Sequence, residues 1–272
     1  MRLTVFLVAV LLVGAGCTNI NKILKSSDYN YKLQQADKFF AAKKYNQAQV
    51  IYEDVFPVFK GSPEFERIYL NWAYCHYYQR DYLNAENIFK GFAESFPNST
   101  KAEEAEYLRA YSFYKQSPRV ELDQTPTYKA ITFMQTYLQK YPSSAHSREA
   151  ADIVDQLEEK LELKSYKTAE LYYNLGYFNA AAVAATELLY EYFDSEKADE
   201  YKLMVIRSRT KYAENSIPAR QVERYNDVLN DCADFYDRYP ESQLGKEVDR
   251  YKKQAENNLK SLRNEQTEKD TK

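Results

Sequence analysis

The sequence predicts an all-α solenoid built from about five helix–turn–helix units and a C-terminal capping helix. Turn residues are sparse, because the 272-residue chain has only 6 Gly and 8 Pro while 28% of its residues are charged. This composition favours long helices joined by short loops. A second observation is an aromatic–Pro–x–Ser mark that recurs along the chain, as FPNS at 96–99, YPSS at 141–144 and YPES at 239–242.

Small residues keep a fixed distance from these marks. Degenerate copies of the mark stand at 59–62 and 192–195, and eleven residues before each aromatic lies a small or medium apolar residue: Ala48, Ala85, Ala130, Ala181 and Val228. Twelve residues before three of them lie Ala36, Ala73 and Ala169. Such intervals indicate two helices that cross closely at their small residues, repeated along the chain.

The mark itself predicts where the second helix of each unit ends and the next unit begins. Apolar residues at offsets of 3, 4, 7, 8 and 11 from the small residue form one helical stripe that stops at the aromatic. The Pro that follows disfavours helical geometry in the residue before it. The Ser two residues further on suits the N-cap of the next helix.

Residues 116–126, QSPRVELDQTP, interrupt unit three. Ala110 and Ala130 are 20 residues apart, where the corresponding interval in units one, two and four is 12, and unit five shows a matching excess from Ser208 to Val228. We interpret the excess as an insertion in the turn between the two paired helices. It is either a tolerated loop or a segment whose Val120 and Leu122 dock on the solenoid.

The chain divides into two sets of repeats. Units one to three occupy residues 30–145, and units four and five with the cap helix occupy residues 146–262. No Gly or Pro interrupts residues 147–175, which predicts one long helix joining the halves. Residues 263–272 are polar and are predicted to be disordered.

The N-terminus has the pattern of a secretory signal. Arg2 precedes an apolar run at 3–13, followed by VGAGC ending at Cys17. We interpret residues 1–16 as a signal peptide, Cys17 as a lipidation site and residues 17–29 as a lipid-anchored linker. An ordinary signal peptide that contains a Cys is the alternative, because Gly14 stands where a lipobox usually has Leu.

No catalytic or metal-binding motif is evident. His76 and His146 fall in different units, and no His, Cys and acidic residues cluster with metal-ligand spacing. The net charge of −3 gives no basic field for nucleic acid. We expect no enzymatic activity, no cofactor, no metal and no nucleic-acid partner. Cys75 and Cys232 lie within different predicted helices, so free buried thiols are favoured over a disulfide.

Aromatic residues recur one turn beyond the small residue of the first helices. Phe39 and Phe40, His76 and Tyr77, Phe113 and Tyr114, and Tyr172 and Tyr173 occupy corresponding places. A solenoid presents its first helices on a concave face, where repeated aromatic residues suit peptide binding. We take Phe40, Tyr77 and Tyr114 as peptide-groove candidates, the alternative being that one residue of each pair is inter-repeat core.

The repeat resembles the tetratricopeptide repeat, although the spacing from Ala36 to Ala73 is 37 residues rather than 34. The chain as a whole resembles the BamD family of outer-membrane β-barrel assembly lipoproteins. The most specific residues are QSPRVELDQTPTYKAITFMQTYLQKYPSSAH at 116–146 and AELYYNLGYFNAA at 169–181. Phe193 departs from the pattern, because it replaces the usual Pro of the mark.

The resemblance implies a non-enzymatic lipoprotein at the periplasmic face of the outer membrane. It implies that the N-terminal repeats receive targeting segments of unfolded outer-membrane proteins and that the C-terminal repeats dock a POTRA domain of the β-barrel insertase. Other assembly lipoproteins would be further partners. The alternatives are a lipoprotein scaffold for cell-wall synthesis or glycan uptake, and a periplasmic adaptor without a lipid anchor.

Overall fold

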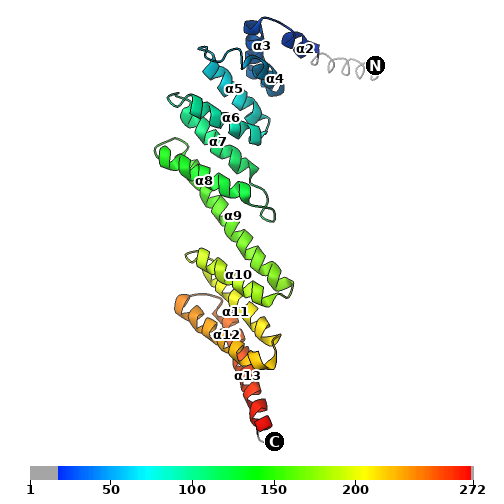
Figure 1. The fold of residues 1–272 in the computed structure, drawn as a ribbon. Coiled ribbons are helices and arrows are strands. Elements are labelled where there is room, and N and C mark those ends of the chain that lie inside the picture. Colours follow the sequence, from blue (N-terminus) through cyan, green and yellow to red (C-terminus); the bar gives the residue numbers. More distant parts are fainter. Residues whose placement is uncertain (1–17, 271–272) are drawn as a thin grey trace, which may run out of the picture. The chain divides into compact units, whose positions relative to one another are not determined.

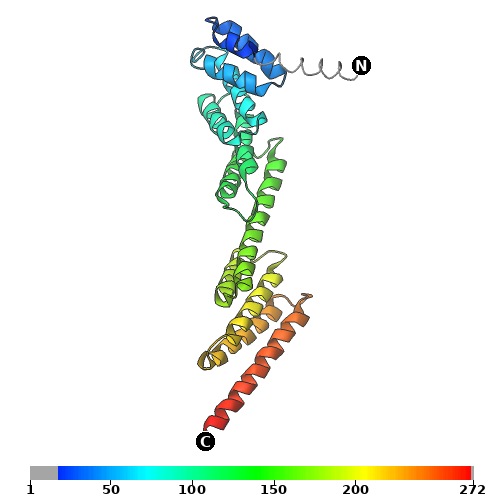
Figure 2. The same ribbon diagram turned by 90° about the vertical axis from the view of Figure 1, so that its right-hand side faces the viewer.

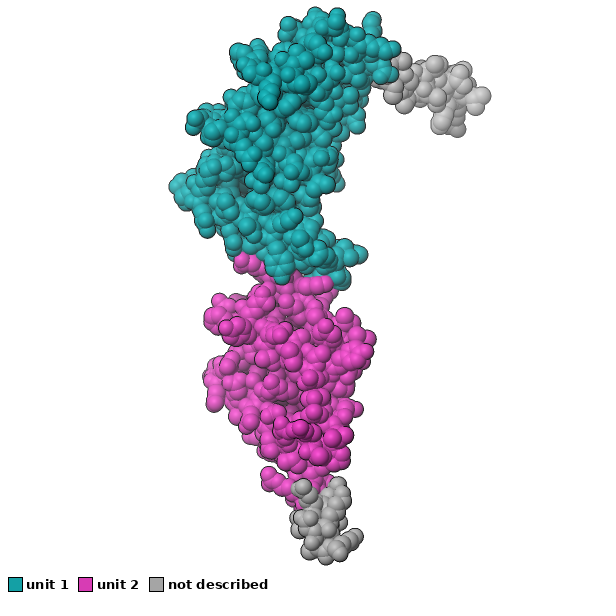
Figure 3. All heavy atoms as spheres, viewed as in Figure 1, with its two compact units in different colours: residues 1–157 teal, residues 158–272 magenta. Residues whose placement is uncertain are grey.

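The computed structural model describes residues 18–270 as twelve helices with no strand in that range (Figure 1). The predicted signal peptide and Cys17 lie outside the described residues. Contacts divide the chain after Leu157 into two compact units, coloured separately in Figure 3. No helix within residues 18–270 combines the length and the apolar character that crossing a membrane requires.

Unit 1 consists of a short first helix, three antiparallel helix pairs and the start of α9. Consecutive helices from α3 to α8 pack against one another, and the start of α9 joins the core of α7 and α8 (Figure 2). The bounds are α2 Thr18–Leu24, α3 Tyr29–Ala41, α4 Tyr45–Val55, α5 Phe65–Tyr78, α6 Tyr82–Ser95, α7 Ala102–Gln116, α8 Thr125–Lys140 and α9 Ser147–Asn174.

Unit 2 contains the rest of α9 and continues the same pattern. Its remaining helices are α10 Phe178–Glu191, α11 Ala198–Glu214, α12 Pro218–Arg238 and α13 Gly245–Asp270. The 28-residue α9 confirms the long helix that the uninterrupted sequence predicts. The contact boundary falls within this helix, twelve residues after the boundary at 145/146 that the repeat pattern suggested.

The small residues that define the repeat form the helix crossings. They are fully buried in both units, which confirms the two-helix interpretation: Ala36, Ala48, Ala73, Ala85, Ala130, Ala169, Ala181 and Val228 are all 0% exposed. A small side chain lets two helix backbones approach closely, and larger side chains then fill the space on either side. The arrangement is the stacked helical hairpin of a tetratricopeptide-repeat solenoid.

Three of the turns inside the hairpins, α3–α4, α5–α6 and α9–α10, share one backbone conformation. Lys43, Arg80 and Gly176 have positive φ angles of 56°, 63° and 81°. In each turn the following N–H donates to the carbonyl oxygen five residues earlier, as from Lys44 to Phe39 at 2.8 Å. This is a Schellman motif, which closes the first helix and turns the chain toward the second.

The Ser of the repeat mark does not occupy the predicted N-cap. Ser99 precedes the capping residue of α7, Lys101, by two positions, and its Oγ accepts from the Lys101 N–H at 2.9 Å. The same bond runs from Leu244 N–H to Ser242 Oγ at 3.1 Å. A hydroxyl can bond the backbone two residues on, so the Ser stabilises a turn just before the helix.

The insertion of unit three is a loop in which Gln124 bonds several backbone carbonyl oxygens. Residues 117–124 connect α7 to α8, and Gln124 is 5% exposed. Its Nε2 donates to the carbonyl oxygens of Arg119 at 2.8 Å and Leu122 at 2.9 Å. Leu122 is 49% exposed, so Gln124 rather than docking of Leu122 orders the loop.

Both ends of the chain contain more helix than the sequence suggested. The segment 17–29, expected to be a linker, contains α2, because Ile23 is apolar and packs at 0% exposure. The tail at 263–272, expected to be disordered, is helical up to Asp270. Residues 263–270 contain no Gly or Pro and several good helix formers, which lets α13 continue past its packed part.

Candidate functional site

The three groove candidates lie in one contiguous set of aromatic side chains on unit 1. Phe40, Tyr77 and Tyr114 lie in the last turns of α3, α5 and α7, so each stands at the same end of the first helix of its hairpin. We call the set the aromatic ladder. Its members are Phe40, Tyr45, Tyr74, Tyr77, Tyr78, Tyr111 and Tyr114.

Ring contacts connect the ladder across all three hairpins. The centroid of Phe40 is 5.6 Å from that of Tyr45, and Tyr45 stacks on Tyr78 at 4.7 Å. Tyr77 is 5.6 Å from Tyr78 and 6.4 Å from Tyr111. These separations lie within the range in which aromatic rings attract one another, so neighbouring rings hold each other in place.

The sequence identified three of the seven rings. Phe40, Tyr77 and Tyr114 are each half-buried, so they belong partly to the inter-repeat core and partly to the surface. Tyr78, which the sequence analysis did not single out, is the most exposed of the seven, at 50%. Tyr74 and Tyr111 also escaped notice, because the repeat interval marks only the position one turn beyond the small residue.

The hydroxyls of Tyr74 and Tyr77 are protonated at neutral pH. Burial raises the pKa of Tyr77 to about 12, with smaller contributions from Tyr111, Tyr82 and Tyr78. Burial also raises the pKa of Tyr74, whose hydroxyl donates to Glu104. The ladder therefore offers neutral rings with hydrogen-bonding edges, which suits a partly apolar polypeptide.

A cation stands at the α7 end of the ladder. The Nζ of Lys115 lies 4.8 Å from the ring centroid of Tyr111 and 5.2 Å from that of Tyr114. A hydrogen bond to Tyr111 contributes most to the raised pKa of Lys115, so this amine is charged at neutral pH. The ladder thus combines apolar contact with one positive charge at its end.

His76 directly precedes Tyr77 in α5 and is a buried packing residue. It is 5% exposed, its Nδ1 lies 2.7 Å from Asp81 Oδ2, and its Nε2 lies 3.5 Å from Glu53 Oε1. Within residues 18–270 no three His, Cys, Asp or Glu side chains gather closely enough to hold a metal ion. Cys75 and Cys232 are free and buried, as the sequence predicted.

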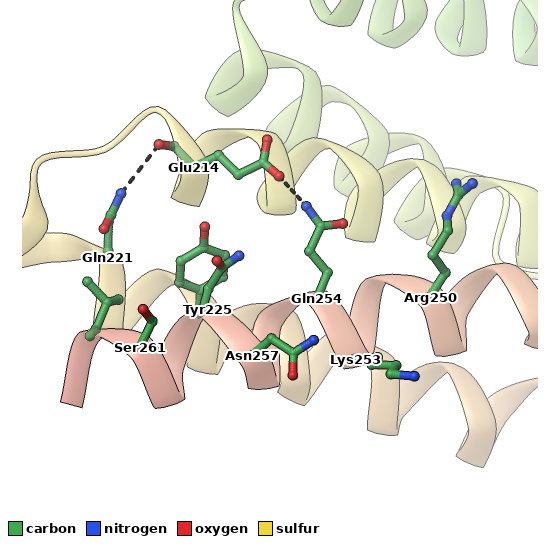
Figure 4. A pocket seen from close by; sticks show the side chains of 10 residues that line it. Glu214, Gln221, Tyr225, Arg250, Lys253, Gln254, Asn257 and Ser261 are labelled. Atoms are coloured by element: carbon green, nitrogen blue, oxygen red, sulfur yellow. Dashed lines mark hydrogen bonds between the residues drawn. The ribbon is translucent and has the colours of Figure 1, made fainter. Parts of the chain in front are cut away.

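Two of the pockets in unit 2 differ in character. A polar pocket of about 710 Å³ lies between α11, α12 and α13, where Gln221 and Gln254 both donate to Glu214 (Figure 4). A more apolar pocket of about 680 Å³ lies beside the end of α10. Tyr190 and Phe193 line the latter and are 88% and 71% exposed.

Residues 27–217 match the YfiO family of outer membrane lipoproteins. The chain belongs to this family. It is also 31% identical over 193 residues to the putative outer membrane protein assembly factor BamD of Aquifex aeolicus, across 70% of this chain and 59% of that protein. The outer membrane protein assembly factor BamD of Caulobacter vibrioides is 27% identical over 115 residues, across 42% and 38%.

The chain thus spans 59% and 38% of the lengths of these two relatives. A solved structure titled as the TPR2AB-domain:pHSP90-complex of yeast Sti1 is similar over 84% of this chain and 98% of its own, at 14% identity and a TM-score of 0.40. At that score the likeness supports no conclusion about function. The family match covers both the aromatic ladder and most of unit 2.

Proposed function

We propose that this chain is a non-enzymatic lipoprotein component of the machinery that assembles β-barrel proteins in the outer membrane. The family is one of outer membrane lipoproteins, and two relatives are named as outer membrane protein assembly factors. The observation that carries the proposal is the aromatic ladder, which runs across three hairpins within the matched residues.

The ladder is the site for targeting segments of unfolded outer-membrane proteins. An extended β segment presents alternate side chains to one surface, and aromatic ones can pack on half-buried rings such as Phe40 and Tyr77. Where the segment ends the client chain, its terminal carboxylate can pair with Lys115. Apolar contact supplies the larger part of the affinity, and the charge fixes the direction of the segment.

Peptide binding tests this site. A fluorescent C-terminal peptide of a β-barrel protein, ending in an aromatic residue, should bind the chain, and Tyr77→Ala should weaken binding by about 1–2 kcal/mol through lost ring contact. Lys115→Met should weaken binding of the peptide that has a free C-terminal carboxylate. It should leave binding of the C-terminally amidated peptide unchanged. Anisotropy titration measures both effects.

Tyr190→Ala is the matched control, because it removes an even more exposed aromatic from unit 2. It should leave peptide affinity unchanged. Equal losses of peptide affinity in Tyr77→Ala and Tyr190→Ala would contradict the assignment of the ladder as the peptide site. So would an unchanged affinity in Tyr77→Ala.

Unit 2 docks the β-barrel insertase through a POTRA domain. The exposed rings of Tyr190 and Phe193 beside the apolar pocket support a docking role, because exposed aromatic residues are typical of protein interfaces. Phe193 also stands where three other units have Pro, so the pocket departs from the repeat where a partner would bind. Other assembly lipoproteins are further partners in this proposal.

Cys17 carries the lipid that holds the chain at the periplasmic face of the outer membrane. The pattern of residues 1–17 supports this anchor. Cys17→Ala should abolish labelling by radioactive palmitate and release the protein from membranes that lack its partners. Palmitate in that variant would show that another residue is acylated.

A further inference from the structure

Helix α2 follows the proposed lipid site without a spacer. Helix α2 begins at Thr18, the residue immediately after Cys17. The helix is fixed to the hairpin, because Ile23 is 0% exposed and joins the core formed by Leu33, Ile51 and Tyr52. A lipid on Cys17 would therefore be attached to a packed element of unit 1.

This attachment limits how far the hairpin can stand from the bilayer. Consecutive Cα atoms are about 3.8 Å apart, so the residue that carries the acyl chains would lie within one residue's length of α2. Side chains on the exposed surface of α2 would then reach lipid headgroups. This step rests on the proposed lipid anchor.

The exposed side chains in this place have the chemistry of a membrane interface. Lys22 on α2 and Lys25, the first residue after α2, are both exposed. Tyr29 and Tyr31, at the start of α3, are each 39% exposed. Asp28 is engaged as the N-cap of α3, where it accepts from the Tyr31 N–H at 3.0 Å.

The charge of residues 18–44, which comprise α2, α3 and the turn after α3, differs from that of the rest of unit 1. Residues 18–44 contain six lysines and two aspartates, whereas residues 45–157 contain eleven basic and fifteen acidic residues. The chain as a whole has a net charge of −3. Positive charge is therefore concentrated next to the proposed anchor.

We propose that α2 and the turn into α3 form a second membrane contact, which binds anionic phospholipid headgroups. Lys22 and Lys25 supply electrostatic attraction, since lysines near an anionic leaflet bind it additively. Tyr29 and Tyr31 supply rings that favour the headgroup region. The acyl chains hold the protein on the membrane, and this lipid-facing surface sets the orientation of the first hairpin.

The test tethers the chain chemically, so that it does not depend on lipidation in the cell. The chain from residue 17 onward is coupled through Cys17 to a maleimide lipid in vesicles. Coupling is selective, because Cys75 and Cys232 are 0% exposed and burial raises the pKa of each thiol to about 12. Amide hydrogen exchange of residues 18–31 is then compared between phosphatidylglycerol and phosphatidylcholine vesicles.

Exchange of residues 18–31 should be slower on phosphatidylglycerol by roughly fivefold or more, the factor expected for one engaged lysine. The difference should vanish in about 1 M NaCl, where the screening length is about 3 Å. Lys22→Glu with Lys25→Glu should abolish it. The control pair Lys252→Glu and Lys253→Glu, exposed on α13, should preserve it.

Equal exchange on the two lipids would overturn the proposal, and so would equal loss in the two variant pairs. Protection on both lipids that survives salt would indicate crowding by the tether alone. Circular dichroism of each variant confirms that it is folded. Because the tether is chemical, these failures would leave the proposed anchor and assembly role standing, whereas Cys17→Ala tests the anchor itself.

Discussion

Small side chains at fixed intervals determine where the helices of each hairpin cross. Ala36, Ala73 and Ala169, identified from spacing alone, are all 0% exposed. The spacing of small residues can be read directly from the sequence, so these helix crossings could be predicted. Tyr74 and Tyr78 could not, because ring contacts between hairpins depend on how successive pairs twist against each other.

The turn residues with positive φ provide a test at single positions. Arg80 has a φ of 63°, which costs a residue with a Cβ about 1 kcal/mol, whereas Gly176 adopts 81° freely. Arg80→Gly should raise the free energy of unfolding by up to about 1 kcal/mol, and Gly176→Ala should lower it by a similar amount. Urea denaturation measures both changes.

The control is Lys90→Gly, an exposed position inside α6, where Gly should destabilise by about 1 kcal/mol. If Arg80→Gly lowers the free energy of unfolding as Lys90→Gly does, the positive φ of Arg80 does not destabilise the turn.

At the scale of the element, tertiary contacts decided what the sequence left open. The insertion at 116–126 was visible as extra length, but only the structure shows that Gln124 fastens it to its own carbonyl oxygens. The segment 17–29 looked polar overall, yet α2 docks through the buried Ile23, with Leu24 packed against the same core. One buried side chain in a short polar segment is a weak signal in composition.

The packing of α5 against α6 depends on the absence of a side chain at Gly91. A Cβ built there would overlap the hydroxyl of Tyr69. Gly91→Ala should therefore destabilise the chain by about 1–3 kcal/mol, as overpacking does. Tyr69→Phe removes that hydroxyl, so it should relieve part of the destabilisation that Gly91→Ala causes.

A double-mutant cycle of thermal or urea unfolding gives the coupling between the two sites. Strictly additive costs for Gly91→Ala and Tyr69→Phe would show that their contact does not cause the loss.

At the scale of the whole molecule, the two units carry different candidate binding features. Unit 1 holds the aromatic ladder and, in residues 18–44, a concentration of lysines. Unit 2 holds the exposed Tyr190 and Phe193 beside an apolar pocket. The helical repeat and the groove candidates followed from spacing, whereas the pockets of unit 2 depend on packing between helices far apart in sequence.

Affinity purification of the tagged protein from membranes tests the central claim most directly. If the chain is an assembly lipoprotein, the β-barrel insertase should co-purify in near-equal amount, and a Tyr190→Ala, Phe193→Ala variant should recover less of it. Recovery of only cell-wall enzymes, or only a sugar transporter, would contradict the claim.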